Sequence, residues 1–520
     1  MLFWQYLLIF IIFTLISWGL SFLVIKLATY YQIFDYPDNK RKFHQKAMPL
    51  GGGMAIYLSF FLAIFLLLPY LLAGGLKLSH WLFFAFGGLV LMIGGFLDDR
   101  FNLPARLQIF FPIIASILPI IGGVKIEYMS SPGGSILTIP SLLSMALIII
   151  WLLAMMYATK LLDGVDGLVS GLGLIGALVI FIFTSSNQYF QPDIALAAFI
   201  LSASILGFLI LNFHPAKLFL GEGGSLLIGY ALGVLAIISG AKIAIALLIM
   251  ALPMMDLVWT IIRRLCRGQN PFSFSDRDHL HHRLLKIGFS VRQTVFIFYF
   301  FALVFGLAAL FLQSQGKFIA LVLLIIIMLS LIIFFNFWEK NNRPKLLLHI
   351  CCAPCAAYIT KHSLMPRFKV VWYFYNPNLS SLAEYDRRLE AAKRAAKIIG
   401  VELIAAPYHH DDWRDMVEGR ESDPEGSKRC YLCYRERLES VFRLAVKRKS
   451  TYFSTSLLSS PYKNKEAIFS ICQDLEQKGQ VRFLAEDFQV DRAFYKSLAW
   501  SKENGIYLQK YCGCEFSLRK

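Results

Sequence analysis

Residues 318–350 read FIALVLLIIIMLSLIIFFNFWEKNNRPKLLLHI, and the character of the chain changes within this stretch. The predominantly apolar run at 318–337 approaches the roughly 20 residues that a membrane-spanning helix needs. Beyond the polar break at 341–344, charged residues recur every few positions and no apolar run is long enough to cross a bilayer. We therefore predict a multidomain chain, with a membrane domain at 1–339, a linker at 340–344 and a soluble domain at 345–520.

Apolar runs before residue 318 predict a polytopic all-α membrane domain with about 11 transmembrane helices in total. We expect these helices near 4–29, 53–72, 81–97, 106–123, 141–158, 168–184, 194–212, 224–239, 241–262, 293–313 and 317–337. Basic residues gather in the connections at 40–46 and 263–283, and such residues favour the cytoplasmic side. We therefore expect a multi-pass protein of the cell (inner or plasma) membrane, with the N-terminus outside and the C-terminal domain in the cytoplasm.

The soluble part alternates short apolar runs with amphipathic segments. Strands are expected at 346–350, 370–375, 402–406, 452–454 and 481–484. The clearest helix, at 381–399, carries its apolar residues on one face, namely Leu389, Ala392, Ala396 and Ile399. This alternation predicts an α/β domain with a mostly parallel sheet. Ligands of such sheets usually bind at the carboxyl ends of the strands, where Cys351 and Cys352 would lie.

The soluble part also carries most of the positive charge. From residue 340 onward there are 31 Lys and Arg against 21 Asp and Glu, which is +10 of the total formal charge of +17. Such an excess suits an anionic partner such as nucleic acid, and equally the anionic lipid of a membrane surface. Composition alone leaves both partners open.

Acidic residues cluster where three of the predicted helices reach the cytoplasmic side. They are Asp98 and Asp99 in GFLDDR, Asp163 and Asp166 in LLDGVDG, and Glu222 in FLGEGG. Asp163 and Asp166 are three residues apart, so they share one face if the segment is helical. Clustered carboxylates at a membrane boundary are costly without a cation, and Mg²⁺ binds carboxylates together with substrate phosphates. The alternative is that these residues only cap helices or fix topology; their clustering favours a site for a magnesium-bound diphosphate.

Three histidines follow in DRDHLHHRLL at 276–285, namely His279, His281 and His282. They could be zinc ligands, but no cysteine or carboxylate at the usual zinc spacing accompanies them. Their neighbours Arg277 and Arg283 suit phosphate better.

Six segments of 1–337 resemble, in the same order, the polyprenyl-phosphate N-acetylhexosamine-1-phosphate transferases of glycosyltransferase family 4, which are relatives of the phospho-MurNAc-pentapeptide translocase. The segments are DYPDNKRKFHQKAMPLGGG, GFLDDR, LLDGVDGLVSG, FLGEGGSLLIGY, PMMDLVWTIIRR and DRDHLHHRLL. The resemblance implies Mg²⁺-dependent transfer of a sugar phosphate from a UDP-N-acetylhexosamine to polyprenyl phosphate within the lipid bilayer, a step of cell wall biogenesis. It also implies homodimers.

The same resemblance implies roles for individual residues. Catalytic roles fall to Asp98, Asp99, Asp163, Asp166 and Glu222, and the Mg²⁺ ligands among them would be Asp163, Asp166 and Glu222. Substrate-binding roles fall to His279, His281 and His282, and the positive charges of Lys160 and Arg283 add two further candidates for phosphate contact. Two departures stand out, because relatives usually carry aspartate at Glu222 and asparagines at Tyr157 and Lys160. They leave open an inactive membrane domain that serves only as an anchor.

Seven of the nine cysteines form three clusters in the soluble part. They are Cys351, Cys352 and Cys355 in LHICCAPC, Cys430 and Cys433 in KRCYLCYRERL, and Cys512 and Cys514 in KYCGCEF. In a reducing compartment this spacing indicates metal rather than disulfides. Four thiolates suit zinc or an iron–sulfur cluster, and the spare thiols favour a cluster with a second metal or a redox pair. Cys472 has apolar neighbours, and we expect it in the core.

The region 345–516 resembles the epoxyqueuosine reductases of the QueH type. The resemblance rests on LHICCAPC, YNPN, EYDRRL, DPEGSKRCYLCYRERL, TSLLSSPYKN and QKYCGC. It implies reduction of epoxyqueuosine to queuosine in tRNA with a [4Fe–4S] cluster and an adjacent metal, both held by the clustered cysteines. Departures at Lys465 and Gln489, where relatives commonly carry His and Arg, concern the RNA contacts. A zinc-stabilised RNA-binding module is the alternative for this half.

Overall fold

The computed structural model describes residues 3–36, 46–130, 136–187, 189–239, 243–266, 268, 279–312, 314–489, 493–509 and 511–517. The chain forms two compact units, Met1–Phe335 and Asn336–Lys520. Each unit has its own hydrophobic core, and each is described by itself.

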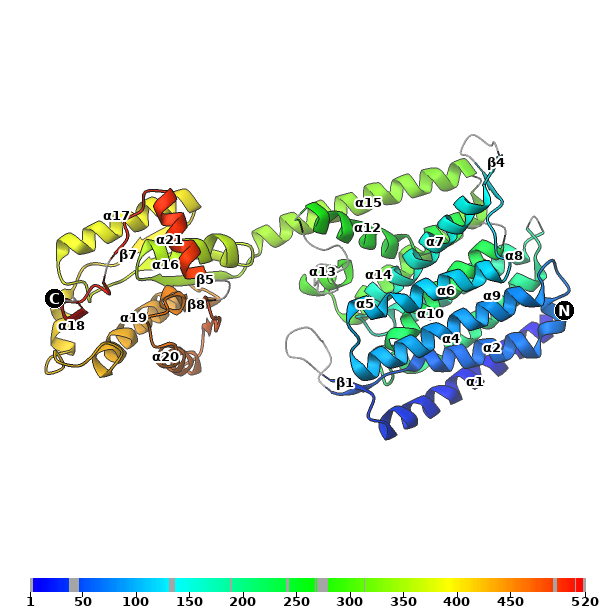
Figure 1. Cartoon of the computed structure of the whole chain (residues 1–520), viewed down its shortest axis with the longest axis horizontal. Helices are drawn as coiled ribbons and strands as arrows, with labels where there is room; N and C mark the ends of the chain where they lie inside the picture. The colour runs from blue at the N-terminus through cyan, green and yellow to red at the C-terminus, as the bar shows by residue number, and fades with distance from the viewer. Residues whose placement is uncertain are drawn as a thin grey trace. The chain divides into compact units, whose positions relative to one another are not determined.

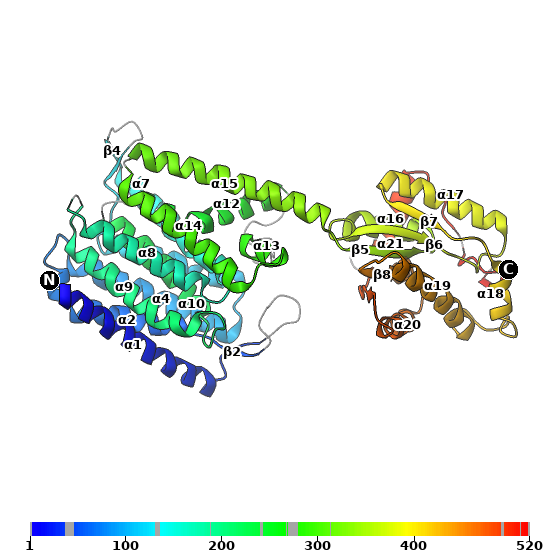
Figure 2. The ribbon, with the colours of Figure 1, turned by 180° about the vertical axis from the view of Figure 1, so that it is seen from behind.

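The N-terminal unit consists of helices, the longer of which run roughly side by side (Figures 1 and 2). Their bounds are α1 Phe3–Tyr30, α2 Gly52–Leu66, α3 Leu68–Leu71, α4 Leu78–Phe101, α5 Ala105–Gln108, α6 Phe110–Ile121, α7 Ser141–Leu162, α8 Leu168–Ser185, α9 Pro192–Asn212, α10 Gly221–Ile238, α11 Ile243–Ile249, α12 Ala251–Cys266, α13 Leu280–Lys286, α14 Val291–Phe311 and α15 Ser314–Asn341. Two antiparallel hairpins pair β1 (Phe34–Asp35) with β2 (Met48–Pro49) and β3 (Tyr128–Ser130) with β4 (Ile136–Thr138).

Eight of the described helices are long and apolar enough to cross a membrane, and all of them lie before residue 342. The predicted count of about 11 is therefore not confirmed. The segment 53–72 is interrupted at Leu67, 106–123 forms the short helices α5 and α6, and 241–262 is divided between α11 and α12. Prolines contribute to these breaks, since Pro69 and Pro253 lie in first helical turns, where a missing N–H is tolerated. Helix α15 ends at Asn341, so the predicted linker at 340–344 begins inside a helix.

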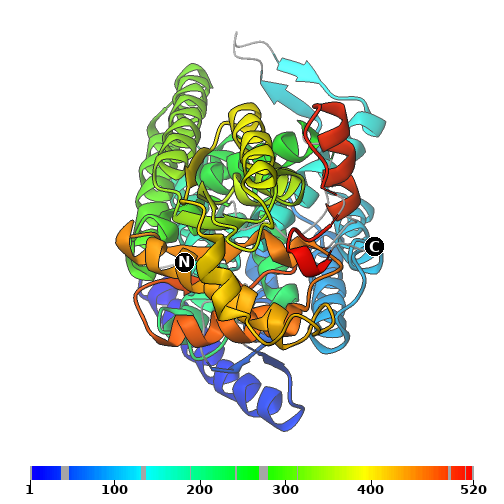
Figure 3. The ribbon, with the colours of Figure 1, turned by 90° about the vertical axis from the view of Figure 1, so that its left-hand side faces the viewer.

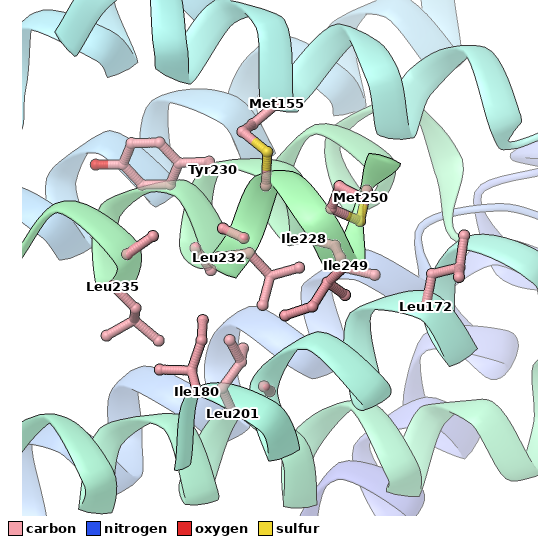
Figure 4. Close-up of a cluster of buried hydrophobic side chains, with 14 of the residues drawn as sticks. Met155, Leu172, Ile180, Leu201, Ile228, Tyr230, Leu232, Leu235, Ile249 and Met250 are labelled. Atoms are coloured by element: carbon pink, nitrogen blue, oxygen red, sulfur yellow. The ribbon is translucent and has the colours of Figure 1, made fainter. Parts of the chain in front are cut away.

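Helix α10 forms the centre of the N-terminal core, because nearly all its residues are buried. Figure 4 shows side chains of α7, α8 and α9 gathered around it, among them Met155, Ile180 and Leu201. A helix that is apolar on all sides packs fully inside a bundle. This packing holds the N-terminal end of α10, which carries Glu222, in a defined place.

The C-terminal unit contains a five-stranded sheet with the order β7-β6-β5-β8-β9, in which every neighbouring pair is parallel. The strands are β5 Lys345–Ile350, β6 Lys369–Phe374, β7 Glu402–Ala405, β8 Tyr452–Thr455 and β9 Arg482–Phe483, so all five predicted strands and the predicted α/β class are confirmed. The helical segments are α16 Ala353–Ile359, η1 Thr360–Leu364, α17 Leu382–Ile399, α18 His410–Met416, α19 Lys428–Lys447, η2 Ser456–Ser459, α20 Lys465–Gln477, α21 Ala493–Glu503 and η4 Glu515–Ser517. Helices cover both faces of the sheet (Figures 1 and 3).

Helix α17 confirms the predicted range, with the Ser381 hydroxyl accepting the Glu384 N–H at its start. Its buried face differs from the predicted apolar stripe, because Glu384 and Arg388 are buried while Leu389 and Ile399 are only partly covered. An ion pair of 2.8 Å joins Glu384 to Arg388. Periodicity alone cannot reveal such a pair, since each charged residue is tolerated in the interior only through its partner.

Candidate functional sites

A cavity of about 880 Å³ lies where the carboxylate clusters of the N-terminal unit meet. The predicted site residues that line it are Asp98, Asp99, Lys160, Asp163, Asp166, Glu222 and His282. The sequence places these residues on four separate segments, and the structure brings them to one space. A cavity of this volume is in the range of small-molecule sites.

Glycines bring the carboxylate-bearing segments together. A Cβ on Gly95 would lie 2.1 Å from the backbone nitrogen of Gly223, and a Cβ on Gly53 would lie 2.1 Å from the Cα of Gly224. Helices α2, α4 and α10 therefore touch backbone to backbone. This approach lets the Glu222 N–H donate to Asp99 Oδ1 at 3.2 Å. The glycines around Glu222 thus serve helix packing.

Lys160 lies between the carboxylates. Its ammonium forms an ion pair with Glu222 and donates to Gln108 Oε1 at 3.1 Å, and both charged side chains are mostly covered. Gln108 in turn donates to Asp98 Oδ1 at 2.8 Å. A continuous polar chain therefore runs from Asp98 through Gln108 and Lys160 to Glu222, and it places a fixed positive charge among the acidic groups.

Asp163 and Asp166 do not share a helical face, because 163–167 is a turn between α7 and α8 and the condition of a helical segment is not met. Asp166 accepts from His214 Nδ1 at 2.7 Å and from the Ala216 N–H at 3.2 Å. Asp163 opens on the cavity. Reduced hydration, and after it the carboxylates of Glu222 and Asp99, raise the pKa of Asp163. Asp163 therefore gains most from a nearby cation, while Asp166 already has polar partners.

The three histidines are placed differently from one another. His279 Nδ1 contacts Asp256 Oδ2 at 2.9 Å, and the Leu280 N–H bonds the other oxygen of the same carboxylate at 3.2 Å, so His279 holds α13 against α12. His281 is fully buried, and burial lowers its pKa well below the usual value, with His282 and His279 adding to the effect. A Cβ on Gly164 would lie 3.3 Å from His281 Nε2, so this ring lies against the turn that carries Asp163. Arg283 is also buried, and Arg277 lies outside the described residues.

The first cysteine group follows β5. The sulfurs of Cys351, Cys352 and Cys355 lie within 4.8 Å of one another, and this group is at the carboxyl end of the parallel sheet, as predicted. Hydrogen bonds from Cys352 and Cys355 hold the pKa of Cys351 well below its usual value. Burial, and after it the bond to Cys351, raise the pKa of Cys352 to about 12. Three close sulfurs of which one is readily ionised are suited to metal coordination.

The second cysteine group joins α19 to the C-terminal segment. Cys433 and Cys514 are buried together in a small cluster with Trp413, Val417, Met416 and Phe516. Cys430 Sγ accepts from the Gly426 N–H at 3.2 Å, and Cys512 Sγ accepts from Lys463 Nζ at 2.9 Å. Burial raises the pKa of Cys433 to about 11. The structure describes all nine cysteines as free thiols; Cys472 lies in the main core as predicted, and Cys266 is exposed.

A buried arginine links the two cysteine groups. Arg437 donates to Asn376 Oδ1 at 2.6 Å and to His349 Nε2 at 3.4 Å, and its charge acts on both Cys433 and Cys351. Burial, and after it the Arg437 guanidinium, lower the pKa of His349 to about 3, so this histidine stays neutral. The arrangement places one fixed positive charge beside thiols from both groups.

The segment that carries Cys512 is fastened by α17. Arg388 Nη1 donates to the Cys512 carbonyl at 3.1 Å and Nη2 to the Tyr511 carbonyl at 3.3 Å. Glu384 and Arg388 belong to the segment EYDRRL, and their ion pair orients the guanidinium that binds the backbone of residues 511–512. Helix α17 therefore orients the segment that carries Cys512.

Sequence reasoning missed several residues of the two sites, namely Gln108, His214, Asp256, Trp413 and Arg437. Each acts by contact with a residue far away in the sequence. Signals existed for Asp256, which lies in the matching segment PMMDLVWTIIRR, for Trp413 in the run HHDDW at 409–413, and for Arg437, one helical turn after Cys433.

Comparisons with known proteins agree with this division. Residues 81–240 match the family model described as Glycosyl transferase family 4, and residues 346–520 match that described as Epoxyqueuosine reductase QueH. A probable undecaprenyl-phosphate N-acetylglucosaminyl 1-phosphate transferase of Bacillus subtilis (strain 168) is 31% identical over 302 residues, covering 57% of this chain and 81% of the relative. The decaprenyl-phosphate N-acetylglucosaminephosphotransferase of Mycobacterium tuberculosis (strain ATCC 25618 / H37Rv) is 35% identical over 297 residues, covering 51% and 72%.

The C-terminal unit has relatives of its own. The epoxyqueuosine reductase QueH of Thermotoga maritima is 38% identical over 175 residues, which is 33% of this chain and 89% of the relative. That of Streptococcus pyogenes serotype M1 is 31% identical over 189 residues, covering 35% and 74%. The chain therefore belongs to two families of enzymes at once, glycosyl transferase family 4 through its N-terminal unit and the QueH epoxyqueuosine reductases through its C-terminal unit.

Proposed function

We propose that the N-terminal unit transfers N-acetylhexosamine 1-phosphate from a UDP-sugar to polyprenyl phosphate. The names of two relatives include undecaprenyl phosphate or decaprenyl phosphate, together with N-acetylglucosamine. The observation that carries the proposal is the cavity in which Asp98, Asp99, Asp163 and Glu222 converge around Lys160. Transfer of a phosphoryl group needs mainly positioning and charge neutralisation, and these groups supply both.

In this reaction an oxygen of polyprenyl phosphate attacks the phosphorus linked to the sugar. The bond from that phosphorus to the bridging oxygen breaks, and UMP leaves with the oxygen. The Lys160 ammonium, oriented by Gln108 and Glu222, neutralises negative charge on the phosphates. Asp98 acts through Gln108, and buried His281 together with partly covered His282 supports the turn that carries Asp163.

The residues fit Mg²⁺, because the carboxylates that line the cavity outnumber the single positive charge that Lys160 provides. Asp99 and Asp163 would hold the ion, with Glu222 taking part if it leaves Lys160. Bound Mg²⁺ neutralises a diphosphate and polarises its phosphorus–oxygen bonds.

One observation favours the second candidate, an inactive membrane anchor: the ion pair with Lys160 occupies Glu222, a predicted metal ligand. UMP release from UDP-N-acetylglucosamine, with Mg²⁺ and polyprenyl phosphate present, separates the two. We expect release that depends on both Mg²⁺ and lipid. If several UDP-sugars release no UMP, while the double variant Lys160→Asn with Glu222→Asp does release it, the anchor is the correct assignment.

For the C-terminal unit, the proposed reaction is reduction of epoxyqueuosine to queuosine in tRNA. The carrying observation is the pair of cysteine groups on either side of Arg437 at the carboxyl edge of the sheet. Both carbon–oxygen bonds of the epoxide break, a carbon–carbon double bond forms between the two carbons, and two electrons and two protons release the oxygen as water. The buried arginine holds positive charge where the thiolates are, and neutral His349 keeps Arg437 in place by accepting its hydrogen bond.

The donor set fits an iron–sulfur cluster with an adjacent metal, because seven thiols in two neighbouring groups exceed what one zinc ion takes. The cysteines Cys351, Cys352, Cys355, Cys430, Cys433, Cys512 and Cys514 would hold them, and a [4Fe–4S] cluster supplies electrons one at a time. Iron and sulfide analysis of anaerobically purified protein is the test. We expect both elements in stoichiometric amounts, whereas zinc without sulfide would assign the unit as a zinc-stabilised RNA-binding module.

Both sites are proposed to face the cytoplasm from a multi-pass protein of the cell membrane. The basic connections at 40–46 and 263–283 support this placement. Proteolysis of inside-out membrane vesicles should digest the C-terminal unit, and protection in those vesicles with digestion in right-side-out ones would reverse the orientation.

A further inference from the structure

The C-terminal unit exposes aromatic rings that its core does not use. Within the described part of this unit, Tyr462 is 74% exposed and Tyr495 is 64% exposed. Both pack on Phe494, with ring centroids 6.0 Å apart for Tyr462 and 5.6 Å apart for Tyr495, each edge to face. We name these three residues the aromatic ridge. Large rings left in water cost hydrophobic free energy, so a contiguous group of them indicates a binding surface.

The ridge is tied to both cysteine groups through the segment 456–463. The Ser456 hydroxyl accepts the Cys351 N–H at 3.1 Å, and the Ser459 hydroxyl donates to the Cys355 carbonyl at 3.0 Å. At its other end, Lys463 bonds the Cys512 sulfur, one residue after Tyr462. The same short segment therefore contacts the sulfur site and presents Tyr462 to solvent.

Positive charge accompanies the rings. Exposed Lys496 follows Tyr495 on α21, and its Nζ lies 5.8 Å from the ring centroid of Tyr358 on α16. Helix α16 starts directly after Cys352. The region from residue 340 onward has a net charge of +10. Rings flanked by lysine match single-stranded nucleic acid, whose bases stack on aromatic faces while its phosphates attract cations.

We propose that the aromatic ridge is a stacking platform for unpaired bases of an RNA loop, which it holds beside the cysteine site. The inference rests on the proposed reductase function, because it assigns a surface to the RNA substrate of that site. A base must leave its helical stack to reach buried sulfurs, and bases flanking it need a surface to stack on. Tyr462 and Tyr495 provide that surface for two neighbouring bases.

The test measures RNA binding by the full chain in detergent. The probes are a hairpin RNA with an unpaired loop and a blunt duplex RNA of the same length. We expect Tyr462→Ala and Tyr495→Ala to weaken hairpin binding by about 10-fold each, while Tyr462→Phe, which keeps the ring, binds as the unsubstituted chain does. Duplex binding should not change. Leu382→Ala is the matched control, since Leu382 is 57% exposed on α17 and lies outside the ridge.

Three results would overturn the proposal: equal hairpin binding by the alanine variants, an equal loss for duplex RNA, or a loss of binding to phosphatidylglycerol vesicles without loss for RNA. The last result would assign the ridge to the membrane surface. Failure of the stacking platform can be distinguished from failure of the proposed reductase function. If the hairpin result holds but the chain lacks iron and sulfide, the reductase assignment fails and the platform stands. If tRNA is reduced with unchanged kcat/KM by Tyr462→Ala, the platform fails and the reductase stands.

Discussion

The carboxylate cavity of the N-terminal unit and the cysteine site of the C-terminal unit place their reactive groups by different means. In the cavity, glycines let helices touch, and the acidic residues at the helix ends meet as a result. At the cysteine site, parallel strands end at one edge, and a helix and the chain's tail add further thiols. Both sites nevertheless hold a largely covered cation beside their anionic groups, Lys160 in one and Arg437 in the other. A fixed cation lowers the cost of assembling like charges before any ligand binds.

The largest expected effect is loss of metal from the cysteine site. Cys433→Ser should remove most of the iron and sulfide, because a buried thiol of the second group is replaced by a weak hydroxyl ligand. The control is Cys472→Ser, because Cys472 lies in the main hydrophobic core of the C-terminal unit and not in the small cluster that contains Cys433. We expect the protein with this substitution to keep its iron and sulfide. Full iron in purified Cys433→Ser would remove this residue from the proposed ligands.

The next effect concerns the cavity. Asp163→Asn should lower the rate of UMP release by about 100-fold or more, because the amide keeps the shape and removes a charge proposed to hold Mg²⁺. Glu127→Gln, an exposed carboxylate outside the cavity lining, should leave the rate unchanged. An equally active Asp163→Asn would show that the site does not work through this carboxylate.

A smaller effect is expected where glycine packing sets the geometry. In Gly95→Ala the new methyl would meet the Gly223 backbone at 2.1 Å, so α4 must move away from α10. We expect a destabilisation of about 1–3 kcal/mol together with slower UMP release. Gly19→Ala is the matched control, because a Cβ there meets nothing within 4 Å and alanine favours helix. If Gly95→Ala and Gly19→Ala have the same thermal unfolding midpoint and the same rate of UMP release, close packing of α4 on α10 does not position the carboxylates.

The smallest effect tests how the tail is held. Arg388→Lys removes the fork that binds two carbonyls, and we expect a loss of about 1–2 kcal/mol, seen as a lower thermal midpoint of the C-terminal unit. Arg387→Lys, at the neighbouring exposed position, should have no measurable effect. Identical midpoints for both variants would mean that α17 does not hold the terminal cysteines.

Prediction from sequence succeeded where a pattern is local. The five strands and the helix at 381–399 follow from short-range alternation, and the place of Cys351 and Cys352 at the carboxyl edge of the sheet follows from their position directly after a strand. It failed where neighbours decide the outcome. A shared face of Asp163 and Asp166 depended on a helical segment, and the α7–α8 connection is instead a turn, in which Asp166 binds His214 from beyond α9. The count of helices was not confirmed, because hydropathy does not show where a buried helix breaks.

The amino-acid sequence by itself determined that this chain has two units of opposite character, one with acidic helix ends and one with clustered thiols. Apolar length, charge and cysteine spacing are local properties, so they can be read along the chain. Only the tertiary structure decided that Lys160 joins Glu222, that Arg437 lies between two cysteine groups and that the aromatic ridge adjoins them. The partners are separated by tens of residues, and the free energy of a buried charge depends on what folding brings beside it.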